Sequence, residues 1–168
     1  GQWFYAVSHG TESWSFRQSW LMYLHVCDDG TLMLDETIRR CGAGQYFAGW
    51  DKIEAEWYMG VTGGLSKIEL KNEDGTHAGF AIAQESGEGE ARYPHVYGIQ
   101  PGSRMTLCAK GQGSIEVLAD GTSLGVVSVD SADFTDVQLP AALPEGEHDL
   151  TLRFTGSITL DWLRIAEA

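Results

Sequence analysis

The chain has 168 residues, of which 43% are hydrophobic and 21% charged, and its formal net charge is -13. This composition is typical of a globular protein, and the length suits one domain, or one domain with a fragment of another. The excess of acidic side chains excludes nucleic acid and anionic membrane surfaces as partners, because no basic patch offsets the phosphate charge. The acidity is compatible with neutral ligands such as sugars, with bound cations, or simply with solubility.

The ends of the chain and its cysteines carry limited information. No signal peptide is visible and no apolar run approaches transmembrane length. Gly1 begins a strand-like run without an initiator Met, so we expect a piece of a longer protein. The cysteines, Cys27, Cys41 and Cys108, form no CxxC pair. A Cys27–Cys41 bridge across a hairpin stays open, and at least one thiol is left over.

The first 41 residues predict about three strands, near 3–7, 20–26 and 31–38, with a turn at Asp28-Asp29-Gly30. Three strands are too few to form a stable core alone. Gly42-Ala43-Gly44 ends this pattern, so we place a boundary between residues 42 and 52. The chain then divides into an incomplete unit, residues 1–49, and a complete one, residues 50–168.

The second unit shows short runs that alternate apolar and polar residues, as half-buried antiparallel strands do. Turns are marked at Glu73-Asp74-Gly75, Asp120-Gly121 and Pro144-Glu145-Gly146. About ten strands suffice for one sandwich, and helical periodicity is nearly absent. The sequence therefore predicts an all-β fold, an antiparallel β-sandwich or jelly roll. The predicted strands lie at 52–59, 66–70, 79–84, 95–99, 104–109, 114–119, 124–129, 136–139, 148–154 and 157–165.

Three carboxylates stand out in this unit. Glu54 and Glu56 are two apart on a predicted strand, so their side chains point to the same face. Asp161 lies in the last predicted strand, and first and last strands are often neighbours in a sandwich. Oxygen ligands of this kind suit Ca²⁺ better than a transition metal. The alternative is a solvated strand face with ordinary acidic residues.

The motifs of this unit resemble carbohydrate-binding module family 6. They are Ile53-Glu54-Ala55-Glu56, the run Gly146 to Phe154, which has the pattern GxHxLxLxF, and Leu160-Asp161-Trp162. The resemblance covers residues 50–168. It implies a β-jelly roll with a structural Ca²⁺ held by Glu54, Glu56 and Asp161, where the metal ties the chain ends together.

Sugar sites in that family use two aromatic rings, which suit the apolar faces of pyranoses, and an Asn. Phe80 and Phe134 fall near the places of the rings, and Thr159 falls near the Asn. Phe lacks a polar group and Thr is shorter than Asn, so the match is poor. The alternative for both Phe residues is a place in the core. Tyr93 and Tyr97, in a polar neighbourhood, are further candidates for the ligand site.

The first unit resembles the last blade of a glycoside hydrolase family 43 propeller. The resemblance covers residues 1–42 and rests on Trp3-Phe4-Tyr5 followed by His9-Gly10, on Arg17-Gln18, on the Gly30-Thr31 turn and on Cys41-Gly42. It implies that His9 faces the propeller centre and that Arg17 lies near a substrate pocket. The alternative for Arg17 is a surface ion pair.

The family 43 resemblance also implies an inverting hydrolase of the β-xylosidase or α-L-arabinofuranosidase type, whose catalytic carboxylates lie in earlier blades. We therefore expect no catalysis from this chain alone. Together the two resemblances imply a secreted or periplasmic protein that binds polysaccharide or oligosaccharide and targets a xylan- or arabinan-degrading enzyme to it, with the enzyme's own N-terminal propeller as a partner. The alternative is a non-binding domain that stabilises the propeller. The absence of GxSxG, Walker and HExxH motifs leaves other enzyme classes unsupported.

Overall fold

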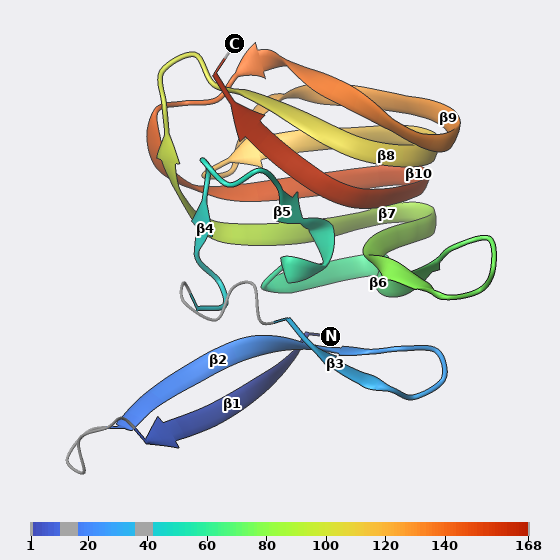
Figure 1. The fold of residues 1–168 in the computed structure, drawn as a ribbon. Helices are drawn as coiled ribbons and strands as arrows, with labels where there is room; N and C mark the ends of the chain where they lie inside the picture. Colours follow the sequence, from blue (N-terminus) through green and yellow to red (C-terminus); the bar gives the residue numbers. More distant parts are fainter. Residues whose placement is uncertain (1, 11–16, 36–41, 168) are drawn as a thin grey trace.

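The computed structural model describes residues 2–10, 17–35 and 42–167, which form two sheets (Figure 1). The first sheet has the order β1-β2-β3, and its strands are β1 (Trp3–Gly10), β2 (Arg17–Val26) and β3 (Leu32–Leu34). The second sheet has seven strands. They are β4 (Tyr46–Phe47), β5 (Ile53–Glu54), β6 (Gly60–Lys71), β7 (His77–Ile99), β8 (Arg104–Ala119), β9 (Thr122–Ala142) and β10 (Gly146–Ala166).

The seven-stranded sheet has the order β4-β7-β10-β8-β9, with β5 added beside β10 and β6 beside β7. Its pairings are antiparallel apart from β4, which runs parallel to β7. The pairing of β5 with β10 brings the first and last predicted strands of the second unit together, with Glu54 opposite Trp162. Strand β4, which the sequence assigns to the first unit, is hydrogen-bonded into this sheet.

A line of glycines bends the long strands and turns one sheet into a sandwich. Register shifts occur in β6, β7, β8, β9 and β10 along the same line across the sheet. Gly111 has a φ of +114°, and a Cβ there would lie 2.1 Å from the Ser157 carbonyl oxygen. Gly156 on the neighbouring strand has a φ of +104°, and its Cβ would lie 2.5 Å from the Gln112 carbonyl oxygen. Only glycine allows the backbones to approach this closely at such a corner.

The bend explains why the sequence predicted more strands than the structure has. The expected pairs 79–84 with 95–99 and 104–109 with 114–119 are each one continuous strand, β7 and β8. In the same way, β9 and β10 each contain two expected strands. In β7, β8 and β10 glycines lie between the two expected strands and bend the chain without ending the strand, whereas β9 has no glycine there. The predicted all-β sandwich is confirmed.

Apolar side chains from both halves of the folded-over sheet meet in one core. Ile82 and Leu160 lie on one side of the bend, and Val96 and Leu150 on the other, and all are essentially inaccessible to water. No helix in the described part of the chain has the length and apolarity needed to cross a membrane.

The three-stranded sheet packs under the sandwich through one of its faces (Figure 1). Tyr23 on β2 is the centre of this contact. Its hydroxyl donates to the Trp57 carbonyl oxygen at 2.5 Å and accepts the Gly44 backbone N–H at 3.1 Å. Tyr46 donates to the same carbonyl, so two buried phenols share one acceptor. Burial raises the pKa of both hydroxyls, which therefore stay protonated at ordinary pH.

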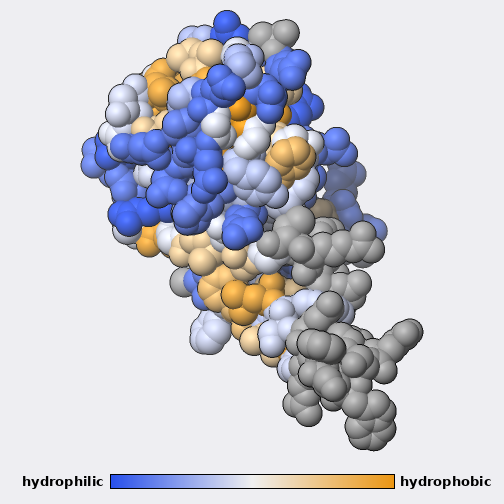
Figure 2. Space-filling view, turned by 90° about the vertical axis from the view of Figure 1, so that its left-hand side faces the viewer, coloured by the Kyte–Doolittle hydropathy of each residue, from blue (hydrophilic) through white to orange (hydrophobic). Residues whose placement is uncertain are grey.

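The opposite face of this sheet is apolar and exposed. Strand pairing and side-chain alternation put Trp3, Tyr5, Val26, Leu32 and Leu34 on this face, and Trp3 is 65% exposed. Met22, opposite Tyr5, lies on the same face and is buried. Figure 2 shows hydrophobic side chains gathered on the lower part of the molecule, where this sheet lies, whereas much of the sandwich above is hydrophilic. The sheet thus has one face on the sandwich and a second, apolar face of which a large part is exposed.

Candidate functional site

An exposed pair of aromatic rings, Phe47 and Tyr97, lies on the surface of the sandwich. Phe47 is 38% exposed and Tyr97 37%. Their centroids are 5.3 Å apart and their planes are inclined by 34°. In the described part of the sandwich, these are the exposed aromatic side chains. Such a pair offers ring faces to the apolar C–H surface of a ligand.

Two glycines give the Phe47 ring its place. The parallel pairing of β4 with β7 sets Phe47 opposite Tyr97. A Cβ on Gly49 would lie 2.7 Å from the Phe47 ring, and a Cβ on Gly98 would lie 2.6 Å from it. The ring therefore lies directly against backbone that has no side chains, and larger residues at these positions would displace it.

Polar groups surround a hollow beside Tyr97. It has a volume of about 310 Å³ and is lined by Gln45, His95, Tyr97 and Glu147. The Glu147 carboxylate lies 2.8 Å from His95 Nδ1, and this contact, the main cause, raises the pKa of His95. His95 has a φ of +53°, and its backbone N–H donates to Asp149 at 2.9 Å. The hollow thus joins an aromatic wall to groups that donate and accept hydrogen bonds, which is the usual make-up of a sugar site.

Two of the ring residues predicted from the sequence are buried, and this corrects their expected role. Phe80 is 6% exposed, and its ring lies 4.6 Å from that of His25 and 4.9 Å from that of His77. Tyr93 is fully buried, with its hydroxyl donating to the Ala55 carbonyl oxygen at 2.7 Å. The faces of both rings are covered by protein. The alternative for Phe80, a place in the packed interior, is what the structure has.

Phe134 and Thr159 lie together on the outer surface near the glycine bend. Thr159 on β10 is opposite Lys110 on β8, and the Lys110 ammonium lies 4.6 Å from the centroid of the Phe134 ring. Phe134 and Thr159 are half-buried. This patch, Lys110, Phe134 and Thr159, has one ring that a cation partly covers, and it is separate from the Phe47–Tyr97 pair.

The three predicted calcium ligands are neighbours with different surroundings. The strand ends at Glu54 and continues as a 3₁₀ helix, η1 (Ala55–Trp57), so the expectation that Glu54 and Glu56 share one strand face is wrong. Glu54 forms an ion pair with Lys52 at 2.9 Å. Glu56 is buried, and its Oε2 has no hydrogen-bond partner in the described structure. Within that part of the chain, these two residues and Asp161 do not form a group whose ligand atoms all lie within 4.8 Å of one another.

Burial dominates the electrostatics of these acids. It raises the pKa of Glu54, of Asp161 and, most strongly, of Glu56. A nearby cation would stabilise the ionised forms of these three buried carboxyl groups, because water solvates them only in part.

The remaining predicted residues lie partly outside what the structure describes. The backbone of β1 and β2 pairs at His9↔Gln18 and Gly10↔Arg17, but the side chains of His9 and Arg17 are not among the described ones. Cys41 also lies outside the described residues, so the Cys27–Cys41 bridge stays a prediction. Cys27 and Cys108 are free and buried.

The fold defined by these elements is that of the family 6 carbohydrate-binding modules, as the motifs of residues 50–168 predicted. A cellobiose complex of a family 6 module from Clostridium stercorarium superposes with a TM-score of 0.62 at 25% identity, covering 74% of this chain and 98% of the module. A family 36 carbohydrate-binding module in complex with calcium and xylotriose gives 0.53 at 13% identity, covering 70% and 100%.

A glycoside hydrolase is also similar to this chain, over more of its length. The structure of the family 43 arabinoxylan arabinofuranohydrolase from Bacillus subtilis, in complex with cellotetraose, gives a TM-score of 0.63 at 15% identity. It covers 90% of this chain, which spans 34% of that enzyme. No family model matches the sequence, and no curated protein matches it.

Sequence reasoning missed Phe47. It stands in the predicted boundary segment between the two units, where no strand was expected. The available signal was its position between glycines at 44 and 49 in an aromatic Tyr46-Phe47 pair. Its partner Tyr97 was a candidate for its polar neighbourhood, and the structure places it on the surface.

Proposed function

We propose that this chain binds carbohydrate through the Phe47–Tyr97 pair and the polar hollow beside it. The observation that carries the proposal is the exposed aromatic pair beside Gln45, His95 and Glu147. Rings of this kind stack on the C–H faces of pyranoses, and the polar groups then fix the orientation of the hydroxyls. The fold, which is shared with modules solved as sugar complexes, supports the proposal.

We further propose that the ligand is a plant cell-wall polysaccharide, xylan or arabinan, and that the chain targets a secreted or periplasmic family 43 hydrolase to it. The motifs of residues 1–42 support this assignment, as does a similarity to the arabinoxylan arabinofuranohydrolase that extends beyond the sandwich. Holding an enzyme on its polymer raises the local substrate concentration. His9 and Arg17 would then belong to the propeller side, and the catalytic carboxylates to blades outside this chain.

The test is a calorimetric titration of the purified chain with xylo-, arabino- and cello-oligosaccharides. We expect binding by the wild type and an affinity at least tenfold lower, about 1.4 kcal/mol, in both Phe47→Ala and Tyr97→Ala. Phe134→Ala is the matched control, because it removes a ring from the other surface patch. Binding that is lost in Phe134→Ala and kept in the other two variants would place the site at the Lys110–Phe134–Thr159 patch and overturn this assignment.

A structural calcium ion is a further part of the proposal. Glu54, Glu56 and Asp161 are the proposed ligands, and the buried Glu56 Oε2, which has no hydrogen-bond partner in the described structure, is suited to bind a cation. The metal would replace Lys52 as the cation beside Glu54. Its charge would also stabilise the ionised form of Glu56, whose pKa burial raises. The ion would tie β5 and η1 to β10.

The calcium proposal predicts that a chelator lowers the thermal stability of the wild type. At a calcium concentration of 100 times the dissociation constant, the ion stabilises the fold by about 2.7 kcal/mol. Glu54→Gln should be less sensitive to the chelator, whereas Glu116→Gln, on the distant part of β8, should respond as the wild type does. A wild type with the same melting temperature in calcium and in chelator would remove the ion from the proposal.

A second candidate function is that of a non-binding domain that stabilises a propeller. The contact of Tyr23 with the sandwich and the apolar outer face of β1–β3 favour it, because that face would suit the preceding blade of a propeller. The same titration separates the two functions. Failure of the wild type to bind any of the oligosaccharides would overturn carbohydrate binding and leave the stabilising role.

A further inference from the structure

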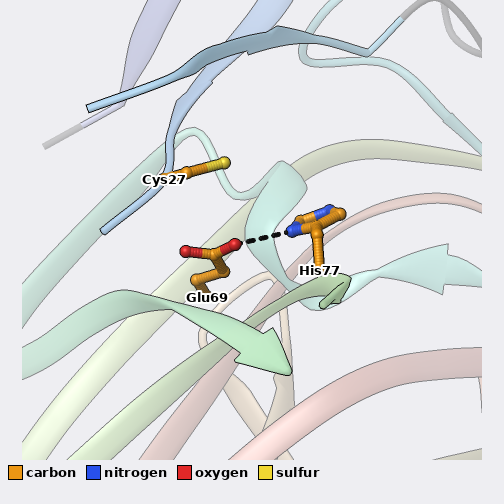
Figure 3. A group of neighbouring side chains, drawn as sticks. All are labelled: Cys27, Glu69 and His77. Carbon is orange, nitrogen blue, oxygen red and sulfur yellow. Dashed lines mark hydrogen bonds and ion pairs between the residues drawn. The ribbon is translucent and has the colours of Figure 1, made fainter. Parts of the chain in front are cut away.

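A group of three potential metal ligands lies where the N-terminal sheet meets the sandwich. Cys27 directly follows β2, Glu69 lies near the end of β6, and His77 is the first residue of β7 (Figure 3). One ligand atom from each, the Cys27 Sγ, a Glu69 carboxylate oxygen and a His77 ring nitrogen, lies within 4.8 Å of the other two. Glu69 and His77 meet through the pairing of β6 with β7, and the packing of the two sheets adds Cys27 to them.

Local hydrogen bonds hold each ligand in place. The turn after β2 is closed by Gly30 N–H to the Cys27 carbonyl oxygen at 2.9 Å. The Asp28 N–H donates to Glu69 Oε2 at 2.8 Å, which ties the backbone beside Cys27 to the sandwich. Glu69 Oε1 remains directed at His77 Nδ1, 3.0 Å away. The Cys27 thiol is also hydrogen-bonded to Glu69, so Glu69 contacts both other members of the group.

The surroundings are suited to a divalent cation. Cys27 is 7% exposed and the Glu69 side chain 6%, whereas the His77 side chain keeps one side open to water. Asp28 and Asp29 lie in the same turn, and together with Glu69 they outweigh the positive charge of Lys71. Burial, and then the carboxylates near the thiol, raise the pKa of Cys27, so a metal would have to displace the thiol proton.

The donor set selects the class of metal. Thiolate, imidazole and carboxylate together suit Zn²⁺ and other borderline transition metals, whereas Ca²⁺ takes oxygen ligands. Around tetrahedral zinc, ligand atoms lie about 3.3–3.6 Å from one another. The Glu69 and His77 atoms, 3.0 Å apart, are already near this separation, and the Cys27 sulfur, within 4.8 Å of both, would move closer when the metal binds. Water would fill the fourth position.

We propose that Cys27, Glu69 and His77 form a zinc site that fastens the N-terminal sheet to the sandwich. Binding releases the proton of the Cys27 thiol, so the affinity rises with pH. This inference does not depend on carbohydrate binding. A second group, His25, Asp35 and Glu56, is close enough for a metal, but the Lys67 ammonium lies 3.0 Å from His25 Nδ1 and opposes a cation there.

The test is a titration of the metal-free full chain with Co²⁺, followed by competition with Zn²⁺. We expect one Co²⁺ per chain, thiolate-to-cobalt absorption in the near ultraviolet, tetrahedral bands in the visible region, and displacement of all of them by Zn²⁺. Cys27→Ser should abolish the thiolate absorption, and both Cys27→Ser and His77→Asn should weaken binding at least tenfold. Zinc should raise the melting temperature of the wild type more than that of either variant.

Matched variants keep the result interpretable. Cys108→Ser removes the other described free cysteine and His148→Asn removes a histidine from the far side of the sandwich, and both should bind Co²⁺ as the wild type does. Circular dichroism of each variant checks that the fold is kept. The proposal is overturned if the wild type gives no thiolate-to-cobalt absorption, if Cys27→Ser keeps it, or if Cys41→Ser alone removes it. The calcium site has no thiol, so its failure and that of the zinc site are separate outcomes.

Discussion

His148 shows how a single side chain can couple the fold to pH. Its Nδ1 lies 2.6 Å from an Asp120 carboxylate oxygen, and its Nε2 lies 3.0 Å from the Glu145 carbonyl oxygen. Both neighbours only accept hydrogen bonds, so both ring nitrogens are satisfied when the imidazole is protonated. The contact with Asp120, and then that with Glu145, raises the pKa of His148. The ring thereby holds the Asp120-Gly121 turn against the start of β10.

A raised pKa in the folded state means that this stabilisation is fully present below the unfolded pKa of about 6.5. It is lost as the pH rises through the higher folded pKa of His148. We therefore expect His148→Asn to be less stable than the wild type at pH 6, with the difference shrinking toward pH 9. Urea unfolding of both proteins across this range measures the difference. Burial lowers the pKa of His25, so its contribution to the pH dependence of stability has the opposite sign. His25 is present in both proteins, and its contribution cancels in the difference between them. A difference independent of pH would contradict the prediction.

The long strands owe their shape to glycines that act as corners. In β8 and β10 the backbones cross so closely that a methyl group at Gly111 would overlap the Ser157 carbonyl oxygen. The corner lets each strand contribute to both halves of the sandwich. One ladder of hydrogen bonds thus continues through the whole domain, and its two halves enclose the core.

We predict that Gly111→Ala in β8 destabilises the fold by at least about 3 kcal/mol, because it adds backbone strain and a clash with the neighbouring strand β10. Gly75→Ala is the matched control. Its φ is also positive, +82°, but a Cβ there would meet no atom within 4 Å. The control should therefore cost only the strain, about 1–2 kcal/mol. Chemical denaturation of both variants provides the comparison, and equal losses would show that the bend tolerates a side chain.

The molecule as a whole combines a well-covered sandwich with a sheet that keeps one apolar face in water. Large exposed apolar patches usually mark contact surfaces. The proposed propeller blade would cover this face in a longer protein. In the isolated chain, the same face should drive self-association.

We expect the isolated chain to sediment as dimers or larger species at high concentration, and the double variant Trp3→Ser/Leu32→Ser to shift toward the monomer. Val126→Ser, which removes an exposed apolar side chain from the sandwich, should behave as the wild type does. Sedimentation velocity over a range of concentrations tests this. Association that persists in the double variant would assign the contact to another surface.

The alternation of apolar and polar residues and the turn residues determined much of this protein in advance. They predicted the all-β fold, and the Asp120-Gly121 turn joins β8 to β9 where the sequence placed it. The motifs of β5 and β10 led to the family 6 fold. These features depend on local backbone preferences and on short patterns, which a sequence carries directly.

The tertiary structure decided which of these residues are available to a ligand. Phe80 and Phe47 both lie in strands of the seven-stranded sheet, yet Phe80 is covered by His25 and His77, whereas Phe47 is exposed and its ring packs against two glycines. In the same way, Cys27 is distant in sequence from Glu69 and His77 and joins them only when the N-terminal sheet packs on the sandwich. Exposure and proximity arise from packing between elements far apart in the chain, and so only the folded structure reveals them.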